Sequence, residues 1–380
     1  MASRVEVSPV AGGSDLAAFI QLPKRLYRGH KGYIAALDME RGEALSPKKN
    51  PYFDHAEVAL FLARRGGKVV GRVSAQIDRL HQEKYRDKTG HFGFLDAEDD
   101  PAIFAALIAK AESWLKQKGM VRAVGPMSFT TNEEIGVLVD GFDSLPMLMM
   151  PFHLPYTAGY IAANGYAKVK DVHAYHLNRD DYRPLGSKRM LERAASEGNV
   201  VVRNLNMKNY QHELETVIDI FNDAWSENWG MVPFTEKEMA AAAKGLKLLI
   251  DPKMVVIAEQ NGESVGMMVC LPNLLEAARD LNGKLLPFGL LKLLYRLKTN
   301  KVHSGRIPLM GIRKKHHGTV LGATLVPMMF EKLRSRLLER GLNRLEMSWI
   351  LEDNLAMRRV LEGIGGKVYK THRVFEKALA

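Results

Sequence analysis

The chain carries the segment LARRGGKVVGR at residues 62–72 and a similar segment, IAEQNGESVGM, at residues 257–267. Four positions match at one constant offset: Ala63, Gly67, Val70 and Gly71 correspond to Ala258, Gly262, Val265 and Gly266. Each segment reads as a strand, a turn that contains glycine and a second strand, because glycine permits the positive φ that such turns need. The sequence therefore predicts the same β-hairpin twice.

The elements that follow each hairpin also come in the same order. A helix over residues 101–118 ends at Gly119 before the strand VRAVGP, and a helix over residues 322–340 ends at Gly341 before the strand RLEMSWI. A further helix and a terminal hairpin complete each half. This order predicts two tandem α/β domains, residues 1–180 and 200–380, each with a mixed sheet flanked by helices and joined by a linker helix over 181–199. The alternative is one large α/β domain with accidental similarity.

The composition fits this reading, since 380 residues with 46% hydrophobic side chains can bury two cores. The single cysteine, Cys270, excludes an internal disulfide framework and a cysteine-rich metal site, so no metal is expected. The first residues, MASRVEVSPV, have no apolar region of a secretory signal, and no run of 18 apolar residues occurs. We therefore expect a cytoplasmic location.

The net charge of +11 indicates an anionic partner, which could be nucleic acid, an anionic membrane surface or an anionic ligand. Residues 281–330 contain no Asp or Glu. The same stretch contains Lys284, Lys292, Arg296, Lys298, Lys301, Arg306, Arg313, Lys314 and Lys315. No helix-turn-helix or RNA-binding motif accompanies this charge, so nucleic acid is not the expected partner.

The loop HHGTVLG, residues 316–322, opens the long helix of the second half. The free N–H groups and the positive dipole end of a helix form an anion site, and Arg313, Lys314 and Lys315 bring positive charge to it. The alternative is a plain strand-to-helix turn with an exposed basic cluster.

Residues 200–377 resemble the GNAT superfamily of acyl-CoA N-acyltransferases, through this loop and through LEDNLAMRRVLEGIGG at residues 351–366. The resemblance implies acyl-CoA as cosubstrate, held by Ile312, Arg313, Lys314, His316, His317, Gly318, Thr319, Gly322 and Asn354. The chain departs from the family pattern at Val320, where a glycine is usual, and at Leu361, where a tyrosine often acts as general acid. Either Tyr369 or a residue of the other half fills that role, or the thiolate leaves unassisted.

The first half carries acids at the matching helix start: Asp96, Glu98, Asp99 and Asp100. These carboxylates suit a helix dipole but repel a pyrophosphate, so we expect this half to shape the substrate site without binding CoA. Two loops, residues 125–143 and 221–234, are the expected sources of acceptor-binding residues. The substrate-binding candidates are Asn132, Glu133, Asn222, Trp225, Asn228 and Trp229. The alternative for both loops is packing around aromatic anchors.

An attacking amine must lose a proton, so a general base is required. The catalytic candidates are Glu346, Glu352, Glu227 and His153. The segment KLLPFGLLKLLYRLKTNK, residues 284–301, has the composition of a helix lying in an anionic membrane interface, and its alternative is a buried helix with solvated lysines.

Over nearly its full length the chain is similar to a bacterial tandem-GNAT group that includes bacterial ceramide synthases, through NPYFDHAEVALFLA, GHFGF, GPMSFTTNEEIGVLVDGFD and SWILEDN. This resemblance implies acyl-CoA-dependent acylation of a long-chain sphingoid amine. With the basic charge and the leucine-rich segment, it leads us to expect a protein peripheral to the inner face of the cytoplasmic membrane. One alternative is acylation of a small polar amine or tRNA-dependent aminoacyl transfer. Another is a non-catalytic regulator that binds nucleic acid on an inactive GNAT fold.

Overall fold

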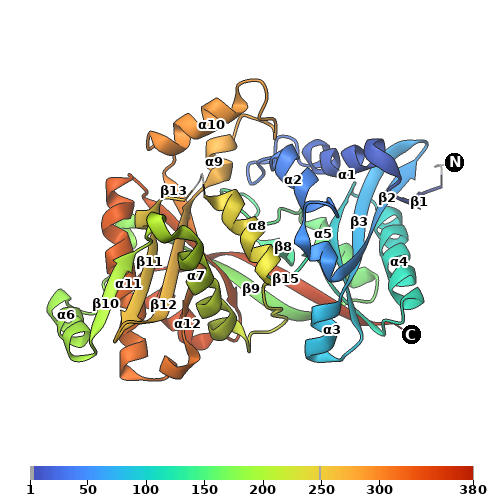
Figure 1. The fold of residues 1–380 in the computed structure, drawn as a ribbon. Coiled ribbons are helices and arrows are strands. Elements are labelled where there is room, and N and C mark those ends of the chain that lie inside the picture. The colour runs from blue at the N-terminus through green and yellow to red at the C-terminus, as the bar shows by residue number, and fades with distance from the viewer. Residues whose placement is uncertain (1–3, 248–249, 380) are drawn as a thin grey trace. The chain divides into compact units, whose positions relative to one another are not determined.

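A computed structural model describes residues 4–247 and 250–379, which form two compact units. Unit 1 comprises Met1–His173, Ala278–Gly289 and Tyr369–Ala380, and unit 2 comprises Ala174–Ala277 and Leu290–Val368. The predicted fold class, tandem α/β repeats with mixed sheets flanked by helices, is confirmed (Figure 1). The domain boundaries at residues 180 and 200 stay a prediction.

Unit 1 contains a mixed sheet with strand order β1-β2-β3-β4-β5-β15. These strands are β1 (Glu6–Pro9), β2 (Ala56–Arg65), β3 (Lys68–Asp78), β4 (Thr89–Ala97), β5 (Arg122–Gly125) and the C-terminal part of β15 (Lys367–Ala378). Neighbouring strands are antiparallel, except that β4 and β5 run parallel. In addition, β8 (Val137–Asp140) pairs with β15, and β6 (Met127–Ser128) pairs with β7 (Glu134–Ile135).

Helices cover both faces of this sheet because successive side chains of a strand point to opposite faces. Phe61 and Ala63 of β2 pack in one core with α4, whereas Leu62 packs in another core with Phe19 of α1. The helices of unit 1 are α1 (Gly12–Leu26), α2 (Asp38–Ala44), α3 (Arg79–Tyr85), α4 (Pro101–Gln117) and α5 (Tyr156–Ala163), with a 3-10 turn, η1, at Pro51–Asp54.

Unit 2 repeats this arrangement with strand order β14-β13-β12-β11-β10. The strands are β10 (Val200–Asn204), β11 (Val255–Gln260), β12 (Glu263–Pro272), β13 (Ser304–Ile312) and β14 (Arg344–Leu351). Again the neighbours are antiparallel, except for the parallel pair β13 and β14. The predicted hairpins are β2–β3 and β11–β12, and their turn glycines, Gly67 and Gly262, have φ values of 79° and 82°.

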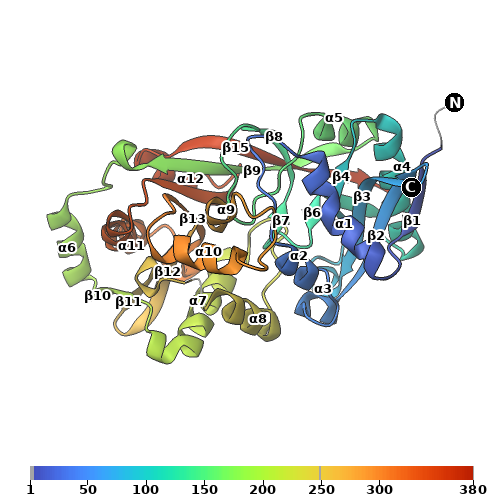
Figure 2. The same ribbon diagram turned by 90° about the horizontal axis from the view of Figure 1, so that it is seen from above.

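The helices of unit 2 are α6 (Lys188–Glu197), α7 (Tyr210–Trp225), α8 (Glu236–Leu246), α9 (Leu274–Ala278), α10 (Gly289–Lys298), α11 (Val320–Glu339) and α12 (Leu355–Gly363). Short 3-10 turns are η2 (Arg179–Asp181), η3 (Met207–Asn209), η4 (Pro252–Met254) and η5 (Lys314–His316). Val256 and Ala258 of β11 pack with α11 in the main core of the unit. On the other face, α7 packs against β12 and β13, with α8 beside it (Figure 2).

The last strand of each sequence half contributes to the core of the unit built mainly from the other half. Strand β9 (Ala167–Asn178) enters unit 2 at Ala174, where Tyr175 and Leu177 join the core with α11 and α12. Strand β15 enters unit 1 at Tyr369, where Phe375 joins the core around α4. Antiparallel pairing of Phe375 with Gly125 places β15 directly beside β5.

No helix within residues 4–247 and 250–379 is long and apolar enough to cross a membrane.

Candidate active site

The two parallel strands of unit 2 form a notch. Their register runs from Ser304 opposite Arg344 to Ile307 opposite Met347, whereas β13 continues to Ile312 and β14 to Leu351. A space of about 50 Å³ lies beyond the last pair and is lined from both strands, by Pro308 and Met310 on one side and Ser348, Trp349 and Ile350 on the other. Beyond this pair β13 is not hydrogen-bonded to β14, so peptide N–H groups on this edge of β13 can donate to a ligand in the notch.

A larger cavity of about 670 Å³ adjoins this notch, and Trp225, Asn228 and Met357 line both spaces. Its size is within the range of small-molecule and cofactor sites. The walls come from the end of α7, the end of β13, η5, the start of α11 and the β14–α12 connection. All of these elements belong to unit 2.

One end of the cavity is the N-terminus of α11. Thr319 caps the helix, because its Oγ1 accepts a hydrogen bond from the Gly322 N–H (3.0 Å) and donates one to the His316 carbonyl oxygen (2.9 Å). Among the described residues, the structure gives the N–H groups of Val320 and Leu321 no partner, as is usual in the first turn of a helix. These two donors and the helix dipole suit a phosphate anion.

Glycine is required at position 322. A Cβ there would lie 2.0 Å from the His316 carbonyl oxygen and 3.2 Å from Cδ1 of Ile312. The loop can therefore fold back onto the start of α11 only because this residue has no side chain. Gly318, with a φ of 71°, makes the turn that brings His316 and Thr319 together.

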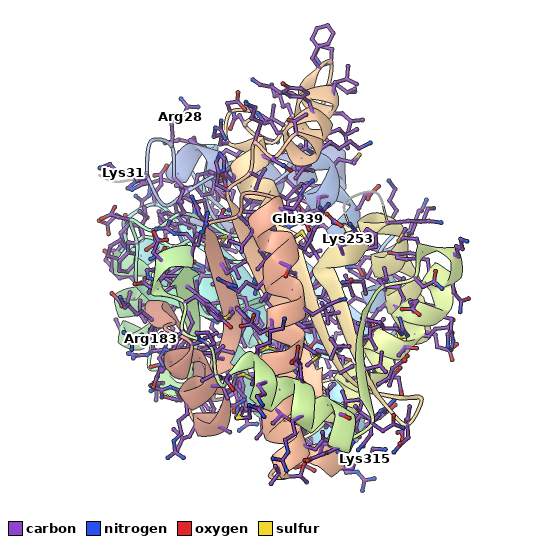
Figure 3. The ribbon with its side chains drawn as sticks, turned by 90° about the vertical axis from the view of Figure 1, so that its left-hand side faces the viewer. Arg28, Lys31, Arg183, Lys253, Lys315 and Glu339 are labelled. Carbon is purple, nitrogen blue, oxygen red and sulfur yellow. The ribbon has the colours of Figure 1, made fainter. Side chains whose placement is uncertain are left out.

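The basic residues predicted around this loop are paired with acids. Arg313 Nη2 is 2.5 Å from Oδ2 of Asp219, and Lys315 Nζ is 2.5 Å from Oε2 of Glu263. Lys314 Nζ is 3.1 Å from Oε1 of Glu227. Figure 3 shows Lys315 near the start of α11, with Glu339 at its other end. Local neutralisation makes the loop a weaker positive centre than the sequence indicated, and it leaves the helix N–H groups as its main anion donors.

The two loop histidines differ. His317 donates from Nε2 to the Ile312 carbonyl oxygen at 3.0 Å, which fixes its tautomer. His316 is buried, and its Nε2 has no hydrogen-bond partner within the described part of the chain. Burial, followed by the nearby Lys315 charge, lowers the pKa of His316, so the imidazole is neutral at neutral pH. Both residues line the cavity, so His316 offers a bound ligand a polar atom that the protein leaves unsatisfied.

Aromatic residues at the end of α7 and just after it form a further wall. Trp225, Asn228 and Trp229 line the cavity, and the Asn228 N–H donates to the Trp225 carbonyl oxygen at 2.8 Å. Gly311 of β13 allows this close packing, since a Cβ there would be 3.1 Å from Cβ of Ala224. Asn222 instead accepts a hydrogen bond from the Phe234 N–H at 3.3 Å, so its side chain holds the loop that follows α7.

The β14–α12 connection closes the remaining side. Asn354 caps α12 by accepting from the Met357 N–H at 3.1 Å, and both residues line the cavity. Glu227 lines it too, with an exposed carboxylate held by Lys314. Of the four candidates for general base, Glu227 is the one that the structure brings to the cavity wall.

Glu346 lies below the notch in a buried ion pair. Its side chain is 0% exposed, and its Oε1 accepts from Ser348 Oγ (2.7 Å) and lies 3.2 Å from Arg306 Nε. The Arg306 guanidinium also lies over the Trp349 ring, 5.2 Å from its centroid. Arg306 of β13 and Glu346 of β14 are opposite each other in the register. Their ion pair therefore links the two strands next to the point where the pairing ends.

The other predicted residues lie elsewhere. Glu352 follows β14, and its carbonyl oxygen accepts from Arg358 Nη1 at 2.9 Å. His153, Asn132 and Glu133 belong to unit 1. His153 is buried and accepts from the Leu138 N–H through Nδ1, and burial lowers its pKa despite the opposing charge of Asp96. Glu133 accepts from the Phe129 N–H at 2.7 Å, and the Asn132 N–H donates to Thr130 Oγ1 at 3.1 Å. Their roles stay predictions.

Sequence reasoning missed several lining residues and the partner of Glu346. Met310, Ala323, Val326 and Met357 line the cavity with apolar groups that look like ordinary core residues in the sequence. Arg306 did carry a signal, because an arginine inside the apolar strand SGRIPLMGI must be paired when buried.

Within the described ranges no group of three His, Cys, Asp or Glu side chains could hold a metal ion, and the expectation of no metal stays a prediction.

Comparison with known proteins supports this picture, although no family model matches the chain. The chain is 47% identical over 376 residues to a bacterial ceramide synthase of Caulobacter vibrioides, covering 99% of this chain and 98% of that protein. It is 42% identical over 368 residues to protein YghO of Escherichia coli, covering 96% and 93%. A solved tandem GNAT protein from the clavulanic acid biosynthesis pathway covers 99% of both chains with a TM-score of 0.57 at 13% identity, which shows the fold. The chain therefore belongs to the bacterial ceramide synthase family and is an N-acyltransferase with a tandem GNAT fold.

Proposed function

We propose that this N-acyltransferase takes its acyl group from a long-chain acyl-CoA and delivers it to the amine of a sphingoid base, acting at a membrane surface. The observation that carries the proposal is the cavity of about 670 Å³ that lies between a helix N-terminus and the notch between two strands. A relative at 47% identity is described as a bacterial ceramide synthase, which supports the same substrate class.

The α11 end of the cavity fits the pyrophosphate of CoA. The N–H groups of Val320 and Leu321 and the polar atoms of His316 and Thr319 would face it, and the dipole of a 20-residue helix favours its charge. Val320 replaces the glycine usual in this family, but its side chain is 86% exposed and so leaves the backbone donors accessible.

The notch end fits the thioester. The reaction forms an amide C–N bond and breaks the thioester C–S bond, while the amine loses a proton and the sulfur leaves as a thiolate that takes one up. Peptide N–H groups of β13 beyond Pro308, which has no N–H itself, would stabilise the charge that develops on the carbonyl oxygen. Glu227, with its carboxylate at the cavity wall, is the proposed acceptor of the amine proton. Leu361 is buried in the core, so α12 supplies no general acid there, and a thiolate can leave without one.

The test is to incubate purified protein with a long-chain acyl-CoA and either sphinganine or 3-ketosphinganine, and to follow free thiol and the amide product by mass spectrometry. Glu227→Gln should reduce kcat roughly 100-fold. Glu215→Gln is the matched control, since Glu215 is exposed on α7, the helix that precedes Glu227, and does not line the cavity. Absence of amide product with every acyl length and both amines would sink the proposal.

Water-soluble amines form the second arm of this assay. Turnover of a small polar amine with no reaction of the sphingoid amines would be consistent with the acyltransferase activity but would refute the sphingoid amine as its substrate. RNA binding with a steep salt dependence and no turnover would instead favour a regulator on an inactive fold.

A further inference from the structure

We infer that α10 is a docking surface for an anionic lipid bilayer. The inference rests on the proposed function and deepens it, because it assigns to particular residues the contact with the membrane from which a long-chain amine would be taken. It is carried by large exposed apolar side chains that coincide with a stretch of basic charge.

Helix α10 has two apolar rows, and only one faces the protein. Leu293 and Leu297, four residues apart, are buried and attach the helix to unit 2. Leu291 and Tyr295 are also four apart but are 67% and 60% exposed. Since each residue advances the helix by about 100°, the exposed row points about 200° away from the buried row. A helix that only covered the core would carry polar groups on that side.

Leu290, in the first turn of α10, is also exposed, at 45%. Three large apolar side chains within residues 290–295 therefore face solvent. Isolated exposed leucines need no explanation, but a cluster of this size marks an interaction site. Figure 1 shows α10 as a separate orange helix lying apart from the sheet strands of unit 2.

Basic residues accompany this apolar row. Lys298, the last residue of α10, and Lys301, three residues further on, are exposed. Arg296 bonds through Nη1 to the Ala277 carbonyl oxygen at 2.7 Å, which fixes the rotation of α10 and so keeps the apolar row outward.

An anionic bilayer matches both features at once. A second copy of this chain would oppose the same lysines to one another across a symmetric contact, which repels. A nucleic acid would bind the lysines but offer the exposed Leu291 and Tyr295 no apolar environment to enter. At the boundary of headgroups and acyl chains, apolar side chains insert while lysines meet anionic headgroups.

The experiment is co-sedimentation of the full chain, without substrates, with vesicles of phosphatidylcholine alone or with phosphatidylglycerol added. We expect binding to the phosphatidylglycerol vesicles that weakens with salt, and at least roughly tenfold weaker binding to the neutral vesicles. Equal binding to both vesicles, or binding to neither, overturns the inference.

Two variants separate the apolar and the basic contributions. Leu291→Ser with Tyr295→Ser should weaken vesicle binding by roughly tenfold for each lost side chain, with Val201→Ser, an exposed valine on β10, as the control. Lys298→Glu with Lys301→Glu should abolish the preference for phosphatidylglycerol, with Lys253→Glu on η4 as the control. Variants that bind like the unmodified chain overturn the inference.

Folding and catalysis are checked separately. Thermal unfolding should be unchanged in these surface variants, and acyl transfer to an amine dispersed in detergent micelles should be retained, because α10 does not line the cavity. Loss of the micellar activity would assign α10 to substrate binding and overturn the docking role. Vesicle binding without any acyl transfer would refute the proposed function and leave the docking surface standing.

Discussion

Replacing Gly322 with alanine tests whether the α11 loop is the cosubstrate site. The new Cβ would lie 2.0 Å from the His316 carbonyl oxygen, whereas real Cβ contacts stay above 3.0 Å. The obstructing atom belongs to the backbone, so no side-chain rotation relieves the clash. The His316 carbonyl or the start of α11 must therefore move by about 1 Å, a displacement large enough to matter for a reacting group.

The same movement breaks local hydrogen bonds. Thr319 Oγ1 links the Gly322 N–H to the His316 carbonyl oxygen, so the two cannot separate without losing the cap. A 1 Å misplacement costs roughly 100-fold in rate, so we expect kcat/KM for acyl-CoA to fall by roughly that factor, or about 2.7 kcal/mol. The loss should appear mainly in KM for acyl-CoA, while KM for the amine stays near its original value.

The assay is steady-state thiol release with varied acyl-CoA, accompanied by a thermal melt. Gly159→Ala in α5 is the matched control, because a Cβ there meets nothing within 4 Å. If Gly322→Ala folds normally and keeps its KM for acyl-CoA within twofold, the cosubstrate does not bind at this loop and the reasoning fails.

Three further predictions concern stability. Glu346→Gln leaves the buried Arg306 charge uncompensated and should lower the free energy of unfolding in urea by about 3 kcal/mol, whereas replacing both residues with leucine should cost less than the single change. Thr319→Val should lower the free energy of unfolding by about 1 kcal/mol and raise KM for acyl-CoA, and unchanged values of both would contradict its role as a cap. Burial, and then the charge of His81, lowers the pKa of His91 to about 3. Between about pH 6.5 and pH 3 the unfolded chain therefore binds a proton at His91 that the folded chain does not bind. Stability should therefore fall as pH drops from about 6.5 toward 3, by on the order of 5 kcal/mol in full, and His91→Gln should flatten this dependence in urea titrations at successive pH values.

Local signals account for what the sequence predicted correctly. The hairpin turns at Gly67 and Gly262 depend on backbone conformation within a few residues, and both glycines have the expected positive φ. The helices predicted over 101–118 and 322–340 are α4 (Pro101–Gln117) and α11 (Val320–Glu339), and the second begins earlier because Thr319 caps it. Hydrophobic periodicity and helix capping depend on residues close together in the chain, so a single sequence is enough to predict them.

Long-range pairings account for what it could not predict. The sequence predicts a terminal hairpin in each half, which is wrong, because each half ends in one continuous strand, β9 or β15. Nothing local assigns Phe375 of β15 to the core of unit 1 or Tyr175 of β9 to that of unit 2. The acids that neutralise the basic loop, Asp219 and Glu263, come from α7 and β12, far away in sequence. The charge of a segment can be counted from the sequence, but its partners are fixed only by the fold.

The two units differ at the N-terminus of the corresponding helices, α4 in unit 1 and α11 in unit 2. At α4 the cap is Asp100, whose Oδ1 accepts the Ala102 N–H at 2.8 Å, and Pro101 has no N–H to offer. The Arg65 hydrogen bond lowers the pKa of Asp100, so this carboxylate stays charged and acts as a built-in anion at the helix dipole. At α11 the cap is the neutral Thr319, and the dipole and two N–H groups remain for a ligand. This contrast supports the prediction that unit 2 alone binds the CoA pyrophosphate, because at α4 an added anion would meet a carboxylate in its place.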